Sequence, residues 1–383
     1  MKKGKPVTDF DTILAGGRII DPAAGLDIVG DVGIIEGRVA AVGLDLSARA
    51  ARETRNVEEC LVVPGLIDLH GHFVPDVHPM ALEADAVCPP SGITTAVDAG
   101  TVGWPAYPSL VRQIERQSTQ MVGFIHLSMI GLVTAAIGLG ELFDPRLIVR
   151  DKTLETLLSD RERLLGLKVR VTEAAFSSVD DARSALRVAR DIVDEAGCIL
   201  MLHVSGSPLP ISEVLAHVRA GDIITHAYHG TTHGILDADF KVREEVWRAR
   251  QDGVIFDVGH AGIPGDHFSL EVAQRAVEDG FWPDTISTDI HRARPGSRSP
   301  SMLEILETFI GLGMPLPELV AAVTERPARA IRIEDGRGTL RTGAPADIAV
   351  LRLSSADERI QLKTELTLQA GEITYTGEGG TVR

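Results

Sequence analysis

The sequence contains very little cysteine, and its three thiols, Cys60, Cys88 and Cys198, form no CxxC pair. A cysteine-based zinc cluster and an even disulfide framework are therefore excluded, and the composition suits a reducing compartment. The chain has no run of about 18 apolar residues, so we expect no membrane-spanning helix. Residues 1–17 are basic but lack the continuous apolar stretch of a signal peptide. These absences predict a cytoplasmic protein without a membrane partner.

Basic residues are also scarce. The chain has 38 Lys and Arg against 54 Asp and Glu, a net charge of −16, which argues against a nucleic-acid partner. No GxGxxG or GxxxxGK[ST] motif opens a helix after an early strand, so an open-sheet nucleotide-binding enzyme has little support. Hydrophobic residues are abundant at 44%, with a mean hydropathy of +0.10, enough to form a large core. A length of 383 residues exceeds one ordinary domain but is common for a (β/α)8 barrel.

The two ends of the chain share one pattern. Residues 10–60 and about 338–383 consist of short β-type runs separated by Gly, Asp and Pro. We therefore predict a small β-sandwich domain that is built from both termini, with residues 1–60 and 336–383.

The middle of the chain, residues 61–335, has a different rhythm. Short apolar runs alternate with loops and helical stretches, such as residues 181–196, where apolar residues recur three and four apart before Gly197 ends the helix. Eight alternations predict an α/β fold of the (β/α)8 TIM-barrel type. The eight predicted strands are 61–72, 93–100, 121–130, 164–172, 198–205, 222–229, 254–260 and 284–291.

Potential metal ligands fall at the ends of five of these runs. The first run ends in His70-Gly71-His72, and residues two apart on a strand point to the same face. Each candidate alone is weak evidence, because most histidines in apolar strands are packed residues. Chemistry in such barrels lies at the carboxyl ends of the strands, so together they predict a metal site. Its predicted ligands are His70, His72, Lys168, His203, His226 and Asp289.

The order HxH, Lys, His, His and Asp on strands 1, 4, 5, 6 and 8 resembles the amidohydrolase superfamily. VVPGLIDLHGH at 62–72 is similar to its first-strand signature, and APADIAVL at 344–351 is similar to its carboxyl-terminal β-domain signature. The resemblance covers essentially the whole chain. It favours the dihydroorotase, hydantoinase and D-aminoacylase branch, and most closely the deacetylase-type amidohydrolases that are often labelled dihydroorotase.

The resemblance implies a site with two divalent metal ions. His70, His72 and Asp289 would bind one ion, His203 and His226 would bind the other, and Lys168, carboxylated on its side-chain nitrogen, would bridge them. The charge logic agrees, because two dications repel an ammonium group, whereas a carbamate is anionic and offers one oxygen to each ion. Zinc is the first expectation for such ligands, with manganese, iron and cobalt as alternatives.

Such a site predicts hydrolysis by a metal-bound hydroxide, with Asp289 as general base and then general acid. The expected substrate is a small anionic acyl compound, an N-acyl amino acid or α-acyloxy carboxylate with an amide or ester bond. The alternatives are a cyclic amidase of the hydantoinase or dihydroorotase type and a non-catalytic homologue. Dihydroorotases typically follow HxH with arginine as HxHxR, whereas Phe73 and Val74 follow here, which speaks against that activity. Relatives often form closed assemblies, so we expect a homo-oligomer.

Several residues near the predicted ligands are candidates for substrate binding. An arginine suits a substrate carboxylate, because its guanidinium binds both oxygens at once. Tyr228 and His229 follow His226 and are candidates to donate to an oxyanion. His126, Asp98 and Asp257 are expected to pack around the ligands or hold them in place. The predicted substrate-binding residues are Arg170, Tyr228, His291 and Arg292, with Arg294 as an alternative arginine.

Overall fold

The computed structural model describes residues 9–262, 265–292, 298–356, 359–378 and 380–381. The chain forms two compact units. Unit 1 comprises residues 1–67, 86–95 and 306–383, and unit 2 comprises residues 68–85 and 96–305. The domain bounds 1–60 with 336–383 and 61–335 stay a prediction.

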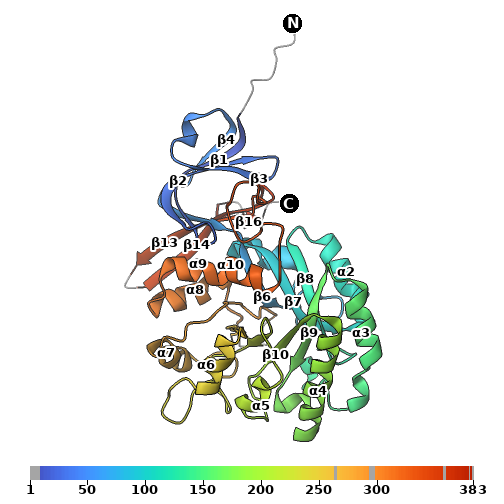
Figure 1. The fold of residues 1–383 in the computed structure, drawn as a ribbon. Coiled ribbons are helices and arrows are strands. Elements are labelled where there is room, and N and C mark those ends of the chain that lie inside the picture. The colour runs from blue at the N-terminus through green and yellow to red at the C-terminus, as the bar shows by residue number, and fades with distance from the viewer. Residues whose placement is uncertain (1–8, 263–264, 293–297, 357–358, 379, 382–383) are drawn as a thin grey trace. The chain divides into compact units, whose positions relative to one another are not determined.

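Unit 1 contains a nine-stranded sheet that is formed by both ends of the chain (Figure 1). The order is β16-β15-β14-β13-β5-β1-β2-β3, and β4 pairs with β1. The central contact joins amino-terminal β5 to carboxyl-terminal β13 in antiparallel register, with Val62 opposite Val350. The strands are β1 (Phe10–Asp21), β2 (Leu26–Ile35), β3 (Arg38–Gly43), β4 (Ala51–Asn56), β5 (Cys60–Pro64), β13 (Ile348–Ala356), β14 (Arg359–Gln369), β15 (Glu372–Thr376) and β16 (Gly380–Thr381).

The core of this sheet also draws on both ends. Alternate residues of a strand face one side, and the inward-facing ones pack into a single aliphatic cluster. Its members from the amino-terminal strands contact members from the carboxyl-terminal strands, so neither end could bury its apolar face alone. The cluster comprises Leu14, Ile19, Val32, Ile34, Val39, Val57, Cys60, Val62, Leu340, Ala346, Ile348, Val350, Leu366 and Leu368.

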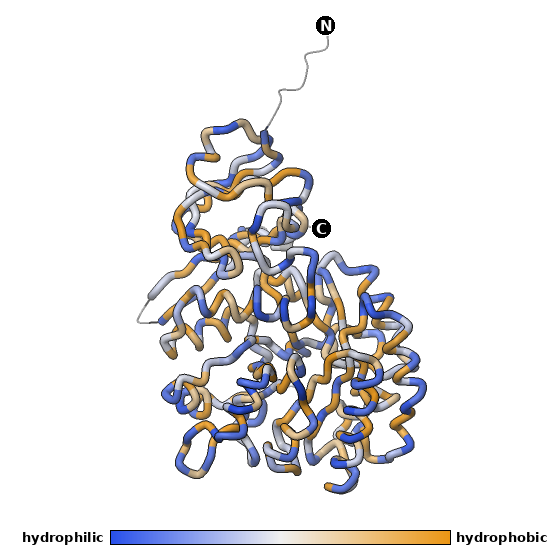
Figure 2. Tube along the Cα trace, viewed as in Figure 1, coloured by the Kyte–Doolittle hydropathy of each residue, from blue (hydrophilic) through white to orange (hydrophobic). Residues whose placement is uncertain are grey.

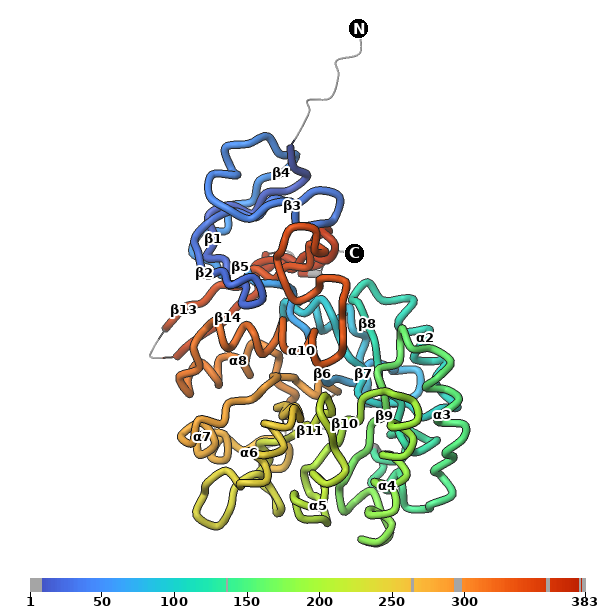
Figure 3. Tube along the Cα trace, viewed as in Figure 1, coloured from blue at the N-terminus to red at the C-terminus, as the bar shows by residue number. Residues whose placement is uncertain are grey.

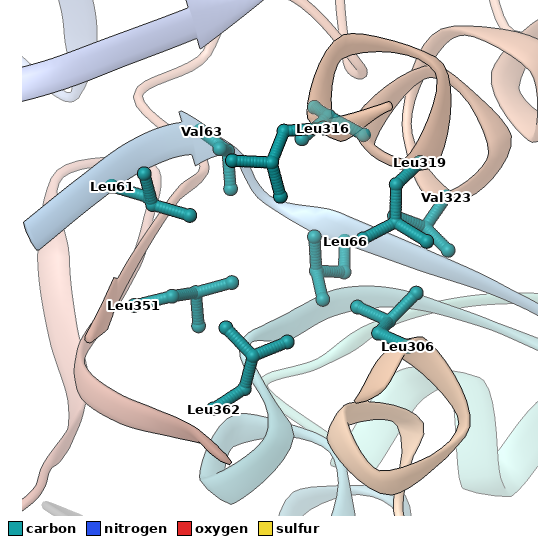
Figure 4. A pocket seen from close by; sticks show the side chains of 10 residues that line it. Leu61, Val63, Leu66, Leu306, Leu316, Leu319, Val323, Leu351 and Leu362 are labelled. Carbon is teal, nitrogen blue, oxygen red and sulfur yellow. The ribbon is translucent and has the colours of Figure 1, made fainter. Parts of the chain in front are cut away.

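A small apolar cavity also lies in unit 1 (Figure 4). Its volume is about 20 Å³, which is room for roughly one water molecule. No lining residue is titratable, so the cavity offers no catalytic group and is too small for a substrate. Its walls are Leu61, Val63, Leu66, Leu306, Leu316, Leu319, Val320, Val323, Leu351 and Leu362.

The second sheet is parallel and supplies the barrel. Its order, β12-β11-β10-β9-β8-β7-β6, follows the chain, as Figure 3 shows for β6 to β11. All residues of β6, β7 and β10 are buried, as expected for strands with both faces covered. The strands are β6 (Leu66–Gly71), β7 (Ile93–Gly103), β8 (Gln120–His126), β9 (Leu164–Arg170), β10 (Ile199–His203), β11 (Ile223–Thr225) and β12 (Ile255–Phe256).

The predicted strands 222–229 and 254–260 are much shorter in the structure, where β11 has three residues and β12 has two. Two further predicted strands differ in kind. The run 61–72 splits at Gly65, because Cys60–Pro64 forms β5 of the other sheet and only Leu66–Gly71 forms the first barrel strand. The run 284–291 is not a continuous strand. It forms isolated parallel bridges from Thr285 to Asp257 and from Ile290 to Gly71, and Asp289 between them has a φ of 50°. That left-handed conformation interrupts an extended strand.

The eighth segment nevertheless joins the two edges of the parallel sheet. Val258 N donates to Thr285 O at 3.1 Å on one side, and His72 N donates to Ile290 O at 3.0 Å on the other. The predicted fold class is therefore confirmed: the protein is an α/β protein with a (β/α)8 TIM barrel and a separate small β-sandwich domain.

Helix α4 (Val179–Ala196) shows how the sequence determines where a barrel helix begins, which face it buries and where it ends. The Ser178 hydroxyl accepts a hydrogen bond from Asp181 N at 3.1 Å, and acidic residues in the first turn favour the helix N-terminus. Small and aliphatic residues three and four apart, such as Ala182, Ala185 and Ala189, are buried. Gly197, with a φ of 65°, ends the helix. The predicted helix 181–196 is thus confirmed.

The other helices are mostly short. Figure 1 places α2, α3 and α4 outside strands β8 and β9, and Figure 2 shows hydrophobic and hydrophilic residues alternating along these outer helices. Within the described residues, no helix combines the length and apolar character that crossing a membrane requires. The remaining helices are α1 (Ala84–Val87), α2 (Tyr107–Arg116), α3 (Arg150–Ser159), α5 (Ile211–Leu215), α6 (Glu244–Gln251), α7 (Leu270–Glu278), α8 (Met302–Gly311), α9 (Leu316–Val323) and α10 (Glu325–Ala330).

Candidate metal centre

Unit 2 brings the predicted ligands together at the carboxyl ends of its strands. His70 lies on β6, Lys168 on β9 and His203 at the end of β10, while His226 directly follows β11. The side chains of His70, Lys168, His203 and His226 are 4% exposed or less. Parallel strands end at the same rim of a barrel, which explains how residues far apart in the sequence converge.

Asp289 is the centre of the first group. Its Oδ1 lies 3.3 Å from His70 Nε2 and 3.0 Å from His72 Nε2, and its Oδ2 lies 3.8 Å from His226 Nε2. Burial raises the pKa of the Asp289 carboxyl, but the imidazoles of His70, His72 and His226 outweigh it and hold that pKa well below its usual value. The carboxylate is therefore an anion that can bind a cation or accept a proton.

Lys168 points into the same group. Its Nζ lies 3.2 Å from His70 Nε2 and 3.3 Å from Met201 Sδ. Burial lowers the pKa of this amine to about 7, although the charge of Asp289 opposes the shift. Near pH 7, the Lys168 amine is therefore neutral in a large share of the protein molecules. A neutral amine is the form that reacts with carbon dioxide to give a carbamate.

His203 and His226 form the other side of the centre, with ring centroids 4.2 Å apart. His226 Nδ1 is 2.5 Å from the carbonyl oxygen of Gly259, so it carries a proton, and the lone pair is on Nε2. His226 Nε2 is buried and has no hydrogen-bond partner among the described residues. His203 Nε2 lies 2.9 Å from the Ser205 hydroxyl. Burial lowers the pKa of both imidazoles well below the usual value, so both rings are neutral and can offer a lone pair to a metal ion.

His267 joins this side of the centre and was not predicted from the sequence. Its ring centroid lies 5.1 Å from that of His203 and 4.5 Å from that of His226. Backbone bonds hold its loop in place: Gly230 N donates to Gly265 O at 2.9 Å and Ser269 N donates to Tyr228 O at 2.8 Å. The loop that follows the seventh strand varies in length and sequence among such barrels. The spacing of the strands therefore did not indicate that His267 would reach the cluster.

The arrangement fits metal ions. The potential ligand atoms of His70, His226 and Asp289 lie within 4.8 Å of one another, as do those of His203, His226 and His267. Two ligands about 2.1 Å from one tetrahedral zinc ion are about 3.4 Å apart, close to the Asp289 distances. Asp289 Oδ1 and His226 Nε2 are both buried without a hydrogen-bond partner among the described residues. Buried lone pairs that face one another without a proton are costly, and a cation between them removes that cost.

The backbone around the centre adopts uncommon conformations. His226, which directly follows β11, and Asp289, which lies within the eighth barrel segment, have φ values of 61° and 50°. Only a few per cent of non-glycine residues have positive φ, although Asp and His tolerate it better than most. Such strain persists where surrounding bonds enforce it and is concentrated at functional sites.

Asp68 and Thr288 hold Asp289 against the first strand. Asp68 accepts bonds from the Thr288 hydroxyl at 2.5 Å and from Thr288 N at 3.0 Å, and Asp289 N donates to His70 O at 2.6 Å. Burial raises the pKa of Asp68 to about 7, although the bonds from Thr288 oppose it. The acidic residue before HxH therefore positions the last ligand of the chain next to the first.

Arg170, two residues after Lys168 on β9, is held by a buried carboxylate. Arg170 Nη1 donates to both oxygens of Glu141 at 3.1 Å each, and the Glu141 side chain is fully buried. The Arg170 side chain is 22% exposed. His126 Nε2 lies 3.7 Å from Glu141 Oε1. Arg170 thus presents a positive charge beside the histidines, and Glu141 was not predicted to anchor it.

The other predicted substrate-binding residues differ in their surroundings. Tyr228 is fully buried, and its hydroxyl donates to Phe281 O at 3.1 Å, so the structure does not bring it to the cluster. His291 Nδ1 is 2.7 Å from Asp289 O, and its ring centroid lies 6.5 Å from that of His72. Arg292 is exposed, and its N donates to Met80 O. Arg294 lies outside the described residues.

Comparison with known proteins agrees with this geometry. The Amidohydrolase family profile matches residues 282–375. A deacetylase of Enterococcus faecalis is 28% identical over 95% of this chain and 95% of its own length. A deacetylase of Agrobacterium fabrum is 30% identical over 84% of this chain and 78% of its own length. An adenine deaminase crystal structure superimposes with a TM-score of 0.85 at 26% identity, covering 95% of this chain and 99% of that one.

The fold and the histidine–aspartate cluster define a hydrolase of the TIM-barrel class. The chain belongs to the amidohydrolase family, as the resemblance in its sequence predicted. It is therefore an enzyme of the kind that hydrolyses carbon–nitrogen bonds.

Proposed function

We propose that this chain is a metal-dependent deacylase that hydrolyses the amide or ester bond of a small N-acyl amino acid or α-acyloxy carboxylate. The observation that carries the proposal is the position of Arg170, which lies two residues after Lys168 on one strand face and is fixed by Glu141. An anionic substrate bound there would lie beside the cluster. The two bacterial relatives described as deacetylases support the same reaction class.

The cluster would hold two divalent ions, with zinc the first expectation. His70, His72 and Asp289 would hold one ion, His203 and His226 the other, and carboxylated Lys168 would bridge them. When bound, such ions acidify a water molecule and polarise a substrate carbonyl. The residues of the chain supply the remaining chemistry.

Asp289 would accept the proton of the attacking water at a carboxylate oxygen and deliver it to the leaving nitrogen or oxygen. Its lowered pKa ensures that the carboxylate starts deprotonated. Arg170 would hold the substrate carboxylate. Glu141 binds through Nη1, so three of the five guanidinium N–H groups, on Nε and Nη2, remain to bind a carboxylate through two parallel bonds.

Val74 supports a deacylase over a dihydroorotase. It occupies the position where an HxHxR motif has its arginine, and it is completely buried. A second arginine for a ring substrate is therefore absent from that position. The homo-oligomeric state and the lack of a nucleic-acid or membrane partner remain part of the proposal.

The test is a substrate panel with the purified protein. It comprises N-acetyl-D- and N-acetyl-L-amino acids, O-acetyl α-hydroxy acids, hydantoins, dihydroorotate and adenine. We expect turnover of the acyl compounds and little or none of the ring substrates. Preferential ring opening would favour the cyclic amidase, preferential ammonia release from adenine would favour a deaminase, and no turnover by metal-loaded protein would favour a non-catalytic homologue.

A further inference from the structure

Two threonines lie directly behind the HxH motif. Thr225 Oγ1 is 2.8 Å from His70 Nδ1 and donates to Asp257 Oδ2 at 2.7 Å. The same arrangement recurs at the second histidine: Thr101 Oγ1 is 2.8 Å from His72 Nδ1 and donates to Asp98 Oδ2 at 2.7 Å. Each threonine thus stands between an imidazole and a carboxylate.

The direction of these bonds follows from the number of hydrogens. A threonine hydroxyl has one hydrogen, and here that hydrogen is donated to the aspartate. The hydroxyl oxygen must then accept from the imidazole, which places the proton of the neutral ring on Nδ1. The lone pair is left on Nε2, the nitrogen that faces Asp289 in both histidines.

The environment of Asp257 keeps it an acceptor. Besides Thr225, it receives the hydroxyl of Thr285 on Oδ1 at 2.8 Å and that of Ser287 on Oδ2 at 2.6 Å. A protonated carboxyl would donate to one of these oxygens rather than accept from all three. Asp98 is held by backbone as well, because Phe73 N and Thr101 N each donate to it at 2.8 Å.

We propose that Thr225 and Thr101 are positioning residues that fix the tautomer and ring orientation of His70 and His72 for metal binding. The inference rests on the proposed function only in so far as the two imidazoles hold an ion. Hydrogen-bond partners of ligand histidines typically change metal affinity by about 10–100-fold when they are removed.

A simpler role for the threonines would be to satisfy buried carboxylates. Thr285 allows the two roles to be distinguished. Its hydroxyl also donates to the Asp257 carboxylate, at Oδ1, but it does not lie between that carboxylate and an imidazole. Thr225 and Thr285 are equally buried, at 0% and 1% exposed. Replacing either with valine preserves shape and removes one hydroxyl donor from Asp257.

The first experiment compares metal affinity in three variants by competition with a chromophoric chelator. We expect Thr225→Val to weaken binding by about 10–100-fold. Thr225→Ser, which keeps the hydroxyl, and Thr285→Val should stay within about threefold of the wild type, even if Thr285→Val lowers the unfolding midpoint as much as Thr225→Val. Equal affinities of the two valine variants would overturn the proposal.

The second experiment needs no metal. Long-range proton–nitrogen spectra of metal-free protein with labelled histidine report the tautomer of each of the 12 imidazoles, and His70→Gln and His72→Gln assign two of them. We expect His70 and His72 as Nδ1–H tautomers, with only His70 altered in Thr225→Val and only His72 altered in Thr101→Val. An Nε2–H tautomer of either ring in the wild type would overturn the inference. A correct tautomer in a protein that binds no metal would instead refute the proposed function.

Discussion

Arg170 donates through one nitrogen, Nη1, to both carboxylate oxygens of the fully buried Glu141. The bond fixes the guanidinium beside Lys168 and offsets part of its charge. In the proposed deacylase, this pair would make the site prefer a substrate with a carboxylate.

The Arg170–Glu141 pair predicts that removing the charge of Arg170 lowers activity mainly on substrates that have a carboxylate. A charge-assisted hydrogen bond contributes about 1.5–3 kcal/mol, so Arg170→Gln should lower kcat/KM for an N-acetyl amino acid by about 10–100-fold. An N-acetyl alkylamine, which has no carboxylate, should lose far less. Arg248→Gln on the exposed face of α6 is the matched control and should behave as wild type. An equal loss on both substrates would show that Arg170 does not bind the carboxylate.

Lys168→Ala should remove both metal content and turnover, because the variant loses the proposed bridge. With a pKa lowered to about 7 by burial, the amine of the wild type should form a carbamate at neutral pH. We expect a carbamate carbon signal after incubation with labelled bicarbonate and metal, absent in Lys168→Ala. Lys152→Ala, at an exposed lysine, is the control. Full metal content and turnover in Lys168→Ala would contradict the bridging carbamate.

His267 should contribute to metal binding on the side of His203 and His226. We expect His267→Gln to lower occupancy of one of the two ions, because the ring lies within ligand distance of that pair. His260→Gln is the control, since His260 stacks on Phe268 with centroids 4.3 Å apart. Metal titration by calorimetry checks the prediction. Unchanged affinity and stoichiometry would assign His267 a packing role.

Acid should destabilise the fold through buried neutral histidines. Burial lowers the pKa of His229 to about 4, from a usual value near 6.5. Between these values the unfolded chain binds more protons than the folded one, so the free energy of unfolding falls as pH drops from about 6.5 to 4. Complete loss of this contribution corresponds to at most about 3 kcal/mol.

Denaturant unfolding at several pH values measures that slope. We expect His229→Gln to have a shallower decline between pH 6.5 and 4 than the wild type, while Thr232→Ala, at an exposed residue without a titratable group, leaves the slope unchanged. His78 and His260, whose pKa values burial also lowers to about 4, should add to the acid sensitivity. Parallel declines in all three proteins would contradict the prediction for His229.

The sequence predicted those features that depend on a few residues close together in the chain or on the position of a residue along its strand. Helix α4 was predictable because Ser178, alanines at helical spacing and Gly197 all favour the same element. The cluster was predictable because parallel strands end at one rim, which makes the position of His70, Lys168 and His203 along their strands sufficient to bring them together.

Long-range contacts decided the features that the sequence did not reveal. The run 61–72 looks continuous, but pairing with β13 draws residues 60–64 into the other sheet. Glu141 and His267 lie in loops without periodicity, so nothing in their spacing indicates that they meet Arg170 and His226. Tyr228 was predicted because it closely follows His226 in the sequence, but strand β11 already ends at Thr225 and the Tyr228 hydroxyl donates to Phe281 O.

The most direct test of the account is the metal content of the purified protein measured together with hydrolysis of an N-acetyl amino acid. We predict about two divalent ions per chain, loss of hydrolysis when a chelator removes them and recovery when zinc is returned. A protein that binds no divalent ion after supplementation, or that hydrolyses the substrate at full rate in excess chelator, would contradict the central claim.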